Sequence, residues 1–325
     1  MTASTPAVGR RPDAAGPGVL PLAAQTSARR LRMEIARRLD GLLAGDHLGY
    51  LAGPGTEAAE ARVYGPGDDV RRIDWSVTAR TSETHVRDAV ADRELETTLL
   101  VDLTASMSFG TVRCEKRDIA LAVAAAVMHL TGGAGDRVGA VVLGSAGIRR
   151  MPPRGGRDAS LALLHRLLSE PRAEGAGPDL AAGLAAVANP PRRRGLVVVL
   201  SDLLSPLDAE PPWARPLRML AGRHDVIVAE VVDPRELTLP DVGVLRLIDP
   251  ETGRHLEVQT RSRALRERYA AAASARRSGY AAAVHRAGAG HVVLRTDRDW
   301  LVDLATFLAT RRRLRAAGRS AALVR

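Results

Sequence analysis

Residues 196–200 read Leu-Val-Val-Val-Leu and are followed at once by Ser201 and Asp202. A run without polar alternation predicts a strand that is buried on both faces, as parallel strands are when helices cover each side of a sheet. Similar runs at residues 97–101 and 226–232 predict two more such strands. A chain with several strands of this kind needs helices to cover them, and this requirement places it in the α/β class.

Helical patterns separate the strands in the order that a parallel sheet requires. Helices are expected at residues 116–131, 158–168, 213–222, 261–287 and 300–313 and from Asp179 onward, and further strands at residues 137–143 and 291–295. Two shorter strands flank the turn sequence Asp-Pro-Glu-Thr-Gly and predict a hairpin. The predicted fold is therefore a doubly wound, mostly parallel α/β sheet with helices on both faces and an N-terminal helical extension.

The chain is expected to divide into four segments. Residues 1–25 are rich in Ala, Pro and Gly and predict a disordered tail, and residues 26–94 hold a helix and an unusual polar motif. The α/β domain is expected at residues 95–313, with the hairpin inserted near residues 242–259. Residues 314–325 are expected to form a basic tail.

Composition excludes several functional classes. The 47 Lys and Arg against 37 Asp and Glu give a net charge of +10, yet Lys116 is the only lysine and lies outside any Gly-Lys-Ser/Thr sequence, so there is no standard P-loop. Cys114 is the only cysteine, which excludes an internal disulfide and a Cys-rich zinc site. No apolar run approaches the ~20 residues of a membrane helix. We expect a cytoplasmic protein without a membrane span and without a nucleotide or organic cofactor.

Two acidic residues follow strands of the predicted sheet, where open parallel sheets bind their ligands. Asp102 is followed by Thr104 and Ser106, so a carboxylate and two hydroxyls alternate along the chain, and Asp202 follows another strand. Such oxygens suit Mg²⁺. The alternative is that Asp102 accepts hydrogen bonds from the following turn and that the hydroxyls cap local backbone.

Asp102-x-Thr104-x-Ser106 resembles the metal-ion-dependent adhesion site of von Willebrand factor A domains, whose motif is Asp-x-Ser-x-Ser. A longer and more specific set of motifs resembles the domain of unknown function 58 (DUF58) family. It comprises Arg62-Val-Tyr64-Gly-Pro-Gly67-Asp68-Asp69-Val-Arg71-Arg72-Ile73-Asp74-Trp75, Thr78-Ala79-Arg80, Ser106-Met107-Ser108-Phe109-Gly110, Lys116, Gly135-Asp136-Arg137-Val138-Gly139 and Ser201-Asp202.

This resemblance implies a von Willebrand A-like core, a partner bound at its top face and joint action with a MoxR-type AAA+ ATPase in assembling or activating protein complexes. It also implies a threonine ligand from a later loop. Here that loop reads Gly177-Pro178-Asp179-Leu180, and proline has no side-chain oxygen. Asp179 can contribute a ligand instead or cap the following helix. A degenerate Mg²⁺ site of Asp102, Thr104, Ser106, Asp202 and Asp179 is the resulting expectation.

The polar motif between Arg62 and Arg80 mixes acids with arginines, whose planar guanidinium groups pair well with carboxylates. We expect an ordered ion-pair network in which Tyr64 and Trp75 are packing anchors and Asp74 and Trp75 are buried. A solvated loop and an exposed docking surface are the alternatives. The family motif residues carried into the site prediction are Arg62, Tyr64, Gly67, Asp68, Asp69, Arg71, Ile73, Asp74, Trp75 and Arg80.

No catalytic constellation is recognisable by spacing. Gly144-Ser145-Ala146-Gly147 is not a nucleophile elbow, and no general base is evident near Asp102. The expected function is a non-enzymatic adaptor that binds a partner protein. A Mg²⁺-dependent hydrolase using the Asp102 cluster is one alternative. An Arg-rich nucleic-acid binder is the other, although aromatic residues are scarce and nucleic acid is not the expected partner.

Overall fold

The computed structural model describes residues 22–43, 61–65, 70, 73–87, 96–131, 135–189, 194–205 and 210–323. Its centre is a six-stranded sheet of order β10-β7-β6-β3-β4-β5, in which every neighbouring pair is parallel except β4 and β5. The strands are β3 (Glu96–Asp102), β4 (Arg137–Gly144), β5 (Gly147–Gly155), β6 (Leu196–Ser201), β7 (Asp225–Val232) and β10 (Gly290–Arg295). The predicted fold class is confirmed.

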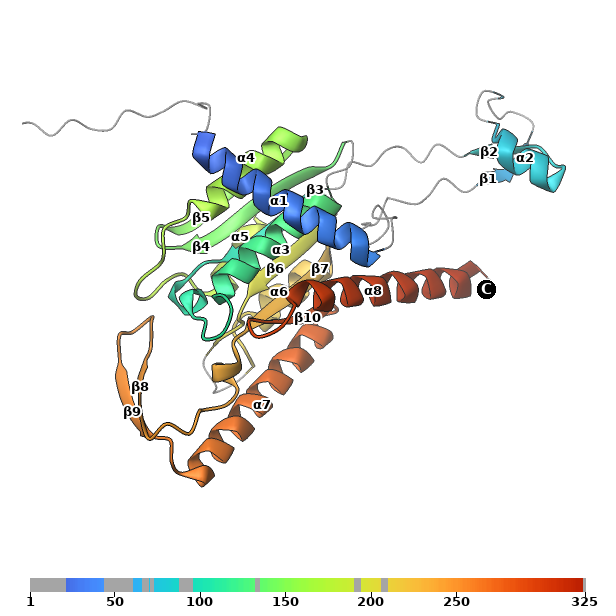
Figure 1. Cartoon of the computed structure of the whole chain (residues 1–325). Coiled ribbons are helices and arrows are strands. Elements are labelled where there is room, and N and C mark those ends of the chain that lie inside the picture. The colour runs from blue at the N-terminus through green and yellow to red at the C-terminus, as the bar shows by residue number, and fades with distance from the viewer. Residues whose placement is uncertain are drawn as a thin grey trace, which may run out of the picture.

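The helices form one layer on each face of the sheet (Figure 1). One layer contains α1 (Leu22–Leu43), α3 (Lys116–Leu130), α4 (Arg157–Leu168) and α8 (Trp300–Leu323), and the other contains α5 (Leu180–Ala188), α6 (Ala214–Ala221) and α7 (Arg263–Arg286). Alternate side chains of each strand enter different layers: Leu99 and Val101 pack with the first and Leu100 with the second. Burial on both faces explains why these strands are continuously apolar.

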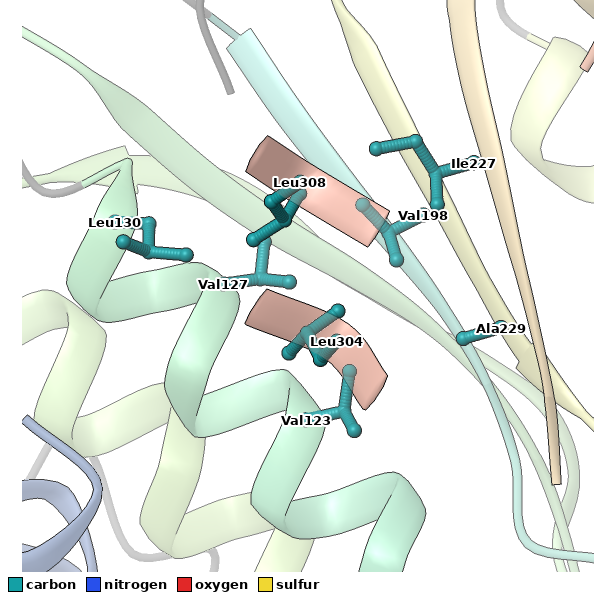
Figure 2. A pocket seen from close by; sticks show the side chains of 8 residues that line it. All are labelled: Val123, Val127, Leu130, Val198, Ile227, Ala229, Leu304 and Leu308. Carbon is teal, nitrogen blue, oxygen red and sulfur yellow. The ribbon is translucent and has the colours of Figure 1, made fainter. Parts of the chain in front are cut away.

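The first layer encloses one small apolar cavity of about 10 Å³ between α3, α8 and the sheet. Figure 2 shows that its lining side chains are all aliphatic: Val123, Val127, Leu130, Val198, Ile227, Ala229, Leu304 and Leu308. The cavity offers no polar group to a water or a ligand and is about the size of one water. It is a packing defect of the core and has no features of a binding site.

Two small antiparallel units accompany the central sheet. One pairs β1 (Ala61–Val63) with β2 (His85–Arg87) around the short helix α2 (Trp75–Thr81). The other is the expected hairpin, β8 (Val244–Ile248) and β9 (His255–Gln259), which projects from the body of the domain (Figure 1). Two 3₁₀ turns, η3 (Ala105–Ser108) and η4 (Pro234–Glu236), follow the ends of β3 and β7.

Several elements differ from the sequence expectation. β5 was not predicted, because its sequence Gly-Ile-Arg-Arg-Met-Pro-Pro-Arg-Gly lacks a regular apolar pattern; it forms by turning back on β4 through Ser145 and Ala146. α1 begins at Leu22, inside the stretch expected to be a tail, and its Ile35 and Leu39 join the core. α8 continues to Leu323, through residues expected to be a basic tail. Among the described residues, no helix is long and apolar enough to cross a membrane.

Candidate functional site

The carboxyl ends of the adjacent strands β3 and β6 bring the two predicted acids together. Asp102 is the last residue of β3, and Asp202 directly follows β6; they are 5% and 4% exposed. Ser201 Oγ donates a hydrogen bond of 2.7 Å to Asp102 Oδ2 and so connects the two strand ends. Figure 1 shows these two strands side by side in the middle of the sheet.

The turn after β3 folds back on Asp102. Asp102 Oδ1 accepts hydrogen bonds from the Thr104 amide at 3.0 Å and from Thr104 Oγ1 at 2.6 Å. Thr104 Oγ1 lies 3.3 Å from Ser106 Oγ, and the Ser106 hydroxyl also hydrogen-bonds to Asp202. The three oxygens that the sequence predicted to converge do so, but they are bonded to one another.

A buried lysine completes the group. Lys116 is the first residue of α3, its side chain is fully buried, and its Nζ lies 2.7 Å from Asp202 Oδ2. The same ammonium is paired with Glu236 Oε1 of η4 and lies 5.9 Å from the centre of the Phe109 ring. Lys116 therefore joins the end of β6 to the turn that follows β7.

A tight loop aims Lys116 at this position. The Lys116 amide donates to the Phe109 carbonyl at 2.9 Å, which closes the loop between η3 and α3. A Cβ on Gly110 would lie 2.2 Å from the Cys114 carbonyl oxygen, closer than real side chains approach, so this position requires glycine. The loop thus fixes the start of α3 and the direction of its first side chain.

Asp233 anchors the turn after β7. It is fully buried and accepts hydrogen bonds from the Thr111 amide and hydroxyl at 2.8 and 2.6 Å, from the Thr296 hydroxyl at 2.7 Å and from the Arg235 amide at 2.9 Å. Glu236 Oε2 accepts from the Asp233 amide at 3.1 Å. Asp233 therefore holds η4, and with it Glu236, beside Lys116.

The charges of this cluster are strongly coupled. Burial, and then the negative charge of Asp202, raise the pKa of Asp102 to about 6. Burial also acts to raise the pKa of Asp202, but the Lys116 ammonium and the hydrogen bonds outweigh it and hold that pKa below its ordinary value. For Lys116, burial opposes the charge, yet Asp202 and Glu236 raise its pKa above the usual range. Lys116 and Asp202 are therefore a charged pair.

The loop expected to supply a further ligand approaches the cluster. A Cβ on Gly177 would lie 3.1 Å from Thr104 Cγ2, so residues 177–179 pass beside the Asp102 turn. Asp179 caps α5 by accepting a hydrogen bond of 2.7 Å from the Ala182 amide, the alternative use given to it by the sequence. Just before this loop, the Gly175 amide donates to the Pro250 carbonyl at 3.2 Å, which ties it to the tip of the hairpin.

These donors do not fit a six-coordinate Mg²⁺ as they are arranged. Both Asp102 oxygens accept hydrogen bonds, one Asp202 oxygen is bound to Lys116 and the other accepts from the Leu204 amide at 3.1 Å. Pro178 adds no oxygen. No group of three or more His, Cys, Asp or Glu side chains in the described part of the chain has the arrangement of a metal site.

The polar motif forms a separate group around α2. Asp74 is 7% exposed and caps this helix, accepting from the Ser76 and Val77 amides at 3.0 and 3.2 Å. Arg80 Nε donates to the Ser76 carbonyl at 3.2 Å. Ile73 forms an isolated antiparallel β-bridge with Val86 of β2. The Tyr64 amide donates a hydrogen bond to the Thr84 carbonyl at 2.7 Å.

The burial expected for Asp74 is confirmed, but that for Trp75 is wrong. The Trp75 side chain, at the first position of α2, is 71% exposed. The Arg62 side chain and Gly67, Asp68, Asp69 and Arg71 lie outside the described residues, so the ion-pair network predicted for them stays a prediction.

Three residues of the cluster were not predicted from the sequence, and no role was predicted for Lys116. Ser201 was noted only within the Ser-Asp motif, while Asp233 and Glu236 were not considered. Their signal was present, since Asp233-Pro-Arg-Glu236 follows a predicted strand as Asp102 does. A groove of about 400 Å³ between β5 and α4 was not predicted either; its lining includes Arg149, Arg150, His165 and Arg166.

The fold and site define an α/β domain whose polar centre, built from acids, hydroxyls and one lysine, lies at the carboxyl edge of a parallel sheet. The chain belongs to the family described as "Protein of unknown function DUF58", which it matches over residues 60–279. It is 48% identical over 293 residues to uncharacterized protein Rv1480 of Mycobacterium tuberculosis, covering 89% of this chain and 90% of that protein. A Mycobacterium avium protein is 43% identical over 171 residues, covering 52% of this chain and 98% of that protein.

Solved structures with a similar fold include BatB from Bacteroides thetaiotaomicron, with a TM-score of 0.38 and 15% identity over 67% of this chain and 98% of that one. The SpRpn10 VWA domain has a TM-score of 0.36 and 12% identity over 65% of this chain and 93% of that one. Likenesses of this size say nothing about partners or activity.

Proposed function

We propose that this protein is a non-enzymatic adaptor that binds a partner protein at the carboxyl edge of its sheet, with the β8–β9 hairpin as part of the binding surface. The main support for this proposal is the exposed apolar surface of the hairpin. The hairpin projects from the domain, and Val244 and Ile248, which lie on one face of the hairpin, are 63% and 58% exposed, while Leu256 is 61% exposed on the opposite face beside its partner Leu247. Exposed aliphatic side chains that share one face, as Val244 and Ile248 do, mark protein interaction sites.

The hairpin tip lies beside the polar cluster. The Pro250 carbonyl at the tip accepts a hydrogen bond from the Gly175 amide. Gly175 lies in the loop that leads to Gly177, which lies beside the Asp102 turn. Partial burial, and then the negative charges of Asp202 and Asp249, raise the pKa of the neighbouring Glu251, so the tip is within electrostatic reach of the cluster. A partner that contacts the hairpin tip would therefore also cover the edge of the sheet.

The state of the polar groups favours binding over catalysis. Asp102 is buried and both of its oxygens accept hydrogen bonds from the protein, so a substrate would have to compete with these donors. The Lys116 ammonium is likewise engaged, because it forms ion pairs with the carboxylates of Asp202 and Glu236. A Mg²⁺-dependent hydrolase remains the rival function, and it would need both groups released.

The resemblance to the DUF58 family, which implies joint action with a MoxR-type AAA+ ATPase, supports such an ATPase as the partner, and the cytoplasm as the place where the two meet. The experiment mixes the purified protein with the MoxR-type ATPase encoded nearest to its gene and measures affinity by biolayer interferometry, with and without ATP. The test variant is the double substitution Val244→Ser/Ile248→Ser, which removes both exposed aliphatic side chains from one face of the hairpin. The control is Met219→Ser, because Met219 is a 64% exposed residue of α6.

We expect the hairpin variant to lose at least tenfold in affinity with an unchanged melting temperature, and the control to bind as the wild type does. Equal binding by all three proteins would remove the hairpin from the interface. Hydrolysis of a phosphoester or peptide substrate that requires Mg²⁺ and Asp102 would favour the rival function.

A further inference from the structure

We propose that the Lys116 ammonium is the resident cation of the polar cluster and takes the place of the divalent metal ion that the Asp-x-Thr-x-Ser motif implies. The proposal goes beyond the adaptor function and does not depend on it, because it concerns the isolated protein. It predicts a site that needs no metal and that becomes a metal site when Lys116 is removed.

The position of Lys116 is the first observation. Its Nζ lies 2.7 Å from Asp202 Oδ2 and is paired with Glu236, while its side chain is fully buried. A Mg²⁺ ligand lies ~2.1 Å from the ion. An ion on Asp202 would therefore share this carboxylate with the ammonium, and two cations in a buried site repel each other strongly because the surroundings screen them little.

The bonding of the two aspartates is the second observation. Thr104 and Ser201 donate to the two oxygens of Asp102, and Lys116 and the Leu204 amide donate to those of Asp202. Ser106 links the two halves, since its hydroxyl contacts both Thr104 Oγ1 and Asp202. Every carboxylate oxygen of this pair thus has a donor from the protein itself, and none of them needs a metal ion to satisfy it.

The missing third ligand is consistent with this arrangement. The loop that carries Pro178 does reach the cluster, because its Gly177 lies against Thr104. At the position where the related sites have a threonine, this chain has a residue without a side-chain oxygen. A cluster whose negative charge is neutralised by a lysine does not need that side-chain oxygen. A metal ion bound here would lack one of its ligands.

The choice of lysine at this one position is the third observation. Lys116 is the only lysine among 47 basic residues, and all the others are arginine. The guanidinium group is a wide planar fork with five donors, whereas the ammonium is a compact point charge with three. A fully buried position between two carboxylates accommodates the compact cation, so the residue type matches a role as a substitute ion.

The experiment measures Mn²⁺ binding by isothermal titration calorimetry and by the loss of the free Mn²⁺ EPR signal. It uses the full-length wild type, Lys116→Ala and Lys116→Ala/Asp202→Asn. The matched control is Arg263→Ala, which removes a cation from an exposed ion pair with Glu267 on α7. Melting temperatures are recorded for each protein from 0 to 10 mM Mn²⁺, with EDTA as the reference.

We expect the wild type and Arg263→Ala to show no binding up to 10 mM Mn²⁺ and no change in melting temperature. Lys116→Ala should bind Mn²⁺ at least tenfold more tightly than this limit, and its melting temperature should rise with Mn²⁺ because the ion binds only the folded state. Lys116→Ala/Asp202→Asn should lose this binding.

Sub-millimolar Mn²⁺ or Mg²⁺ binding by the wild type that Asp102→Asn abolishes would overturn the proposal. So would a folded Lys116→Ala protein that gains no Mn²⁺ affinity. If Lys116→Ala does not fold by itself, we expect Mn²⁺ to restore its native circular dichroism spectrum. A variant that stays unfolded in 10 mM Mn²⁺ would overturn the proposal as well.

Discussion

Ser201 Oγ donates to Asp102 Oδ2 at 2.7 Å and accepts a hydrogen bond from the Leu203 amide at 3.1 Å. Leu203 has a φ of 60°, which a residue other than glycine rarely adopts, and its side chain is buried. Strained backbone of this kind persists only where the surroundings fix it. The chain thus turns sharply just after Ser201, which hydrogen-bonds to Asp102, and Asp202, which pairs with Lys116.

The raised pKa of Asp102 predicts a specific pH dependence. In the folded protein Asp102 keeps its proton up to a pKa of about 6, whereas an ordinary aspartate has a pKa of 3.8. The folded state therefore binds more protons between these values, and the free energy of unfolding falls as the pH rises through them. A shift of about two units corresponds to ~3 kcal/mol. Urea denaturation in EDTA should show the wild type losing up to this amount relative to Asp102→Asn between pH 4 and pH 7.

The opposite sign is expected for Asp202, whose pKa is lowered. Its carboxylate contributes stability that is fully present above about pH 4 and is lost as the pH falls through the lowered pKa, so the wild type should lose stability relative to Asp202→Asn below pH 4 and change little relative to it between pH 4 and pH 7. Parallel pH profiles for the wild type and Asp102→Asn would contradict the assignment of the raised pKa to Asp102.

A second prediction concerns the buried pair of Lys116 and Asp202, whose side chains are 0% and 3% exposed. Lys116→Met keeps the side-chain length but leaves Asp202 and Glu236 without their cation, and loss of one partner of a buried pair costs ~3–5 kcal/mol. Lys116→Met/Asp202→Asn should recover part of this loss. Urea denaturation of the wild type, both single variants and the double variant gives the coupling energy directly. Additive effects would mean that the two charges do not interact.

The central sheet could be predicted because its strands are apolar on both faces, as Leu196 to Leu200 show. β5 could not, because an edge strand that carries Arg149, Arg150 and two prolines is stabilised by its pairing with β4 rather than by its own composition. α8 was expected to end earlier, since the Arg-rich sequence after Leu308 no longer shows a buried face. The local hydrophobic pattern was thus sufficient to predict those elements that are buried in the core.

The site was predicted in part. Asp102 and Asp202 were found because strand ends gather at one edge of a parallel sheet. The pairing of Lys116 with Glu236 joins residues 120 positions apart, and no local pattern reports a contact of that kind. Trp75 was predicted to be buried from its aromatic type and its alternation with Ile73. The helix that starts at this residue turns it outward instead.

A third prediction tests Asp233 as the anchor of the turn after β7. Asp233→Ala removes the acceptor for two hydroxyls and two amides in a fully buried position, so it should cost ~3 kcal/mol of the free energy of unfolding. Asp297→Ala is the control, because it removes a partly exposed ion pair with Arg295 and should cost ~0.5 kcal/mol or less. Equal losses in urea denaturation would show that Asp233 has no special role in holding η4.

The last prediction separates the two neighbours Asp74 and Trp75 in the family motif. Asp74 caps α2 through the amides of Ser76 and Val77, and loss of such a cap costs ~1 kcal/mol. In hydrogen exchange, Asp74→Ala should therefore speed exchange of these two amides, whereas Asp74→Ser, which can also cap a helix, should largely preserve their protection. Trp75→Ala removes a side chain that is 71% exposed and should change the free energy of unfolding by less than ~0.5 kcal/mol. If Trp75→Ala instead destabilises the protein more than Asp74→Ala does, the indole is buried in solution. If Trp75→Ala leaves stability unchanged but weakens ATPase binding, the exposed indole is part of the docking surface.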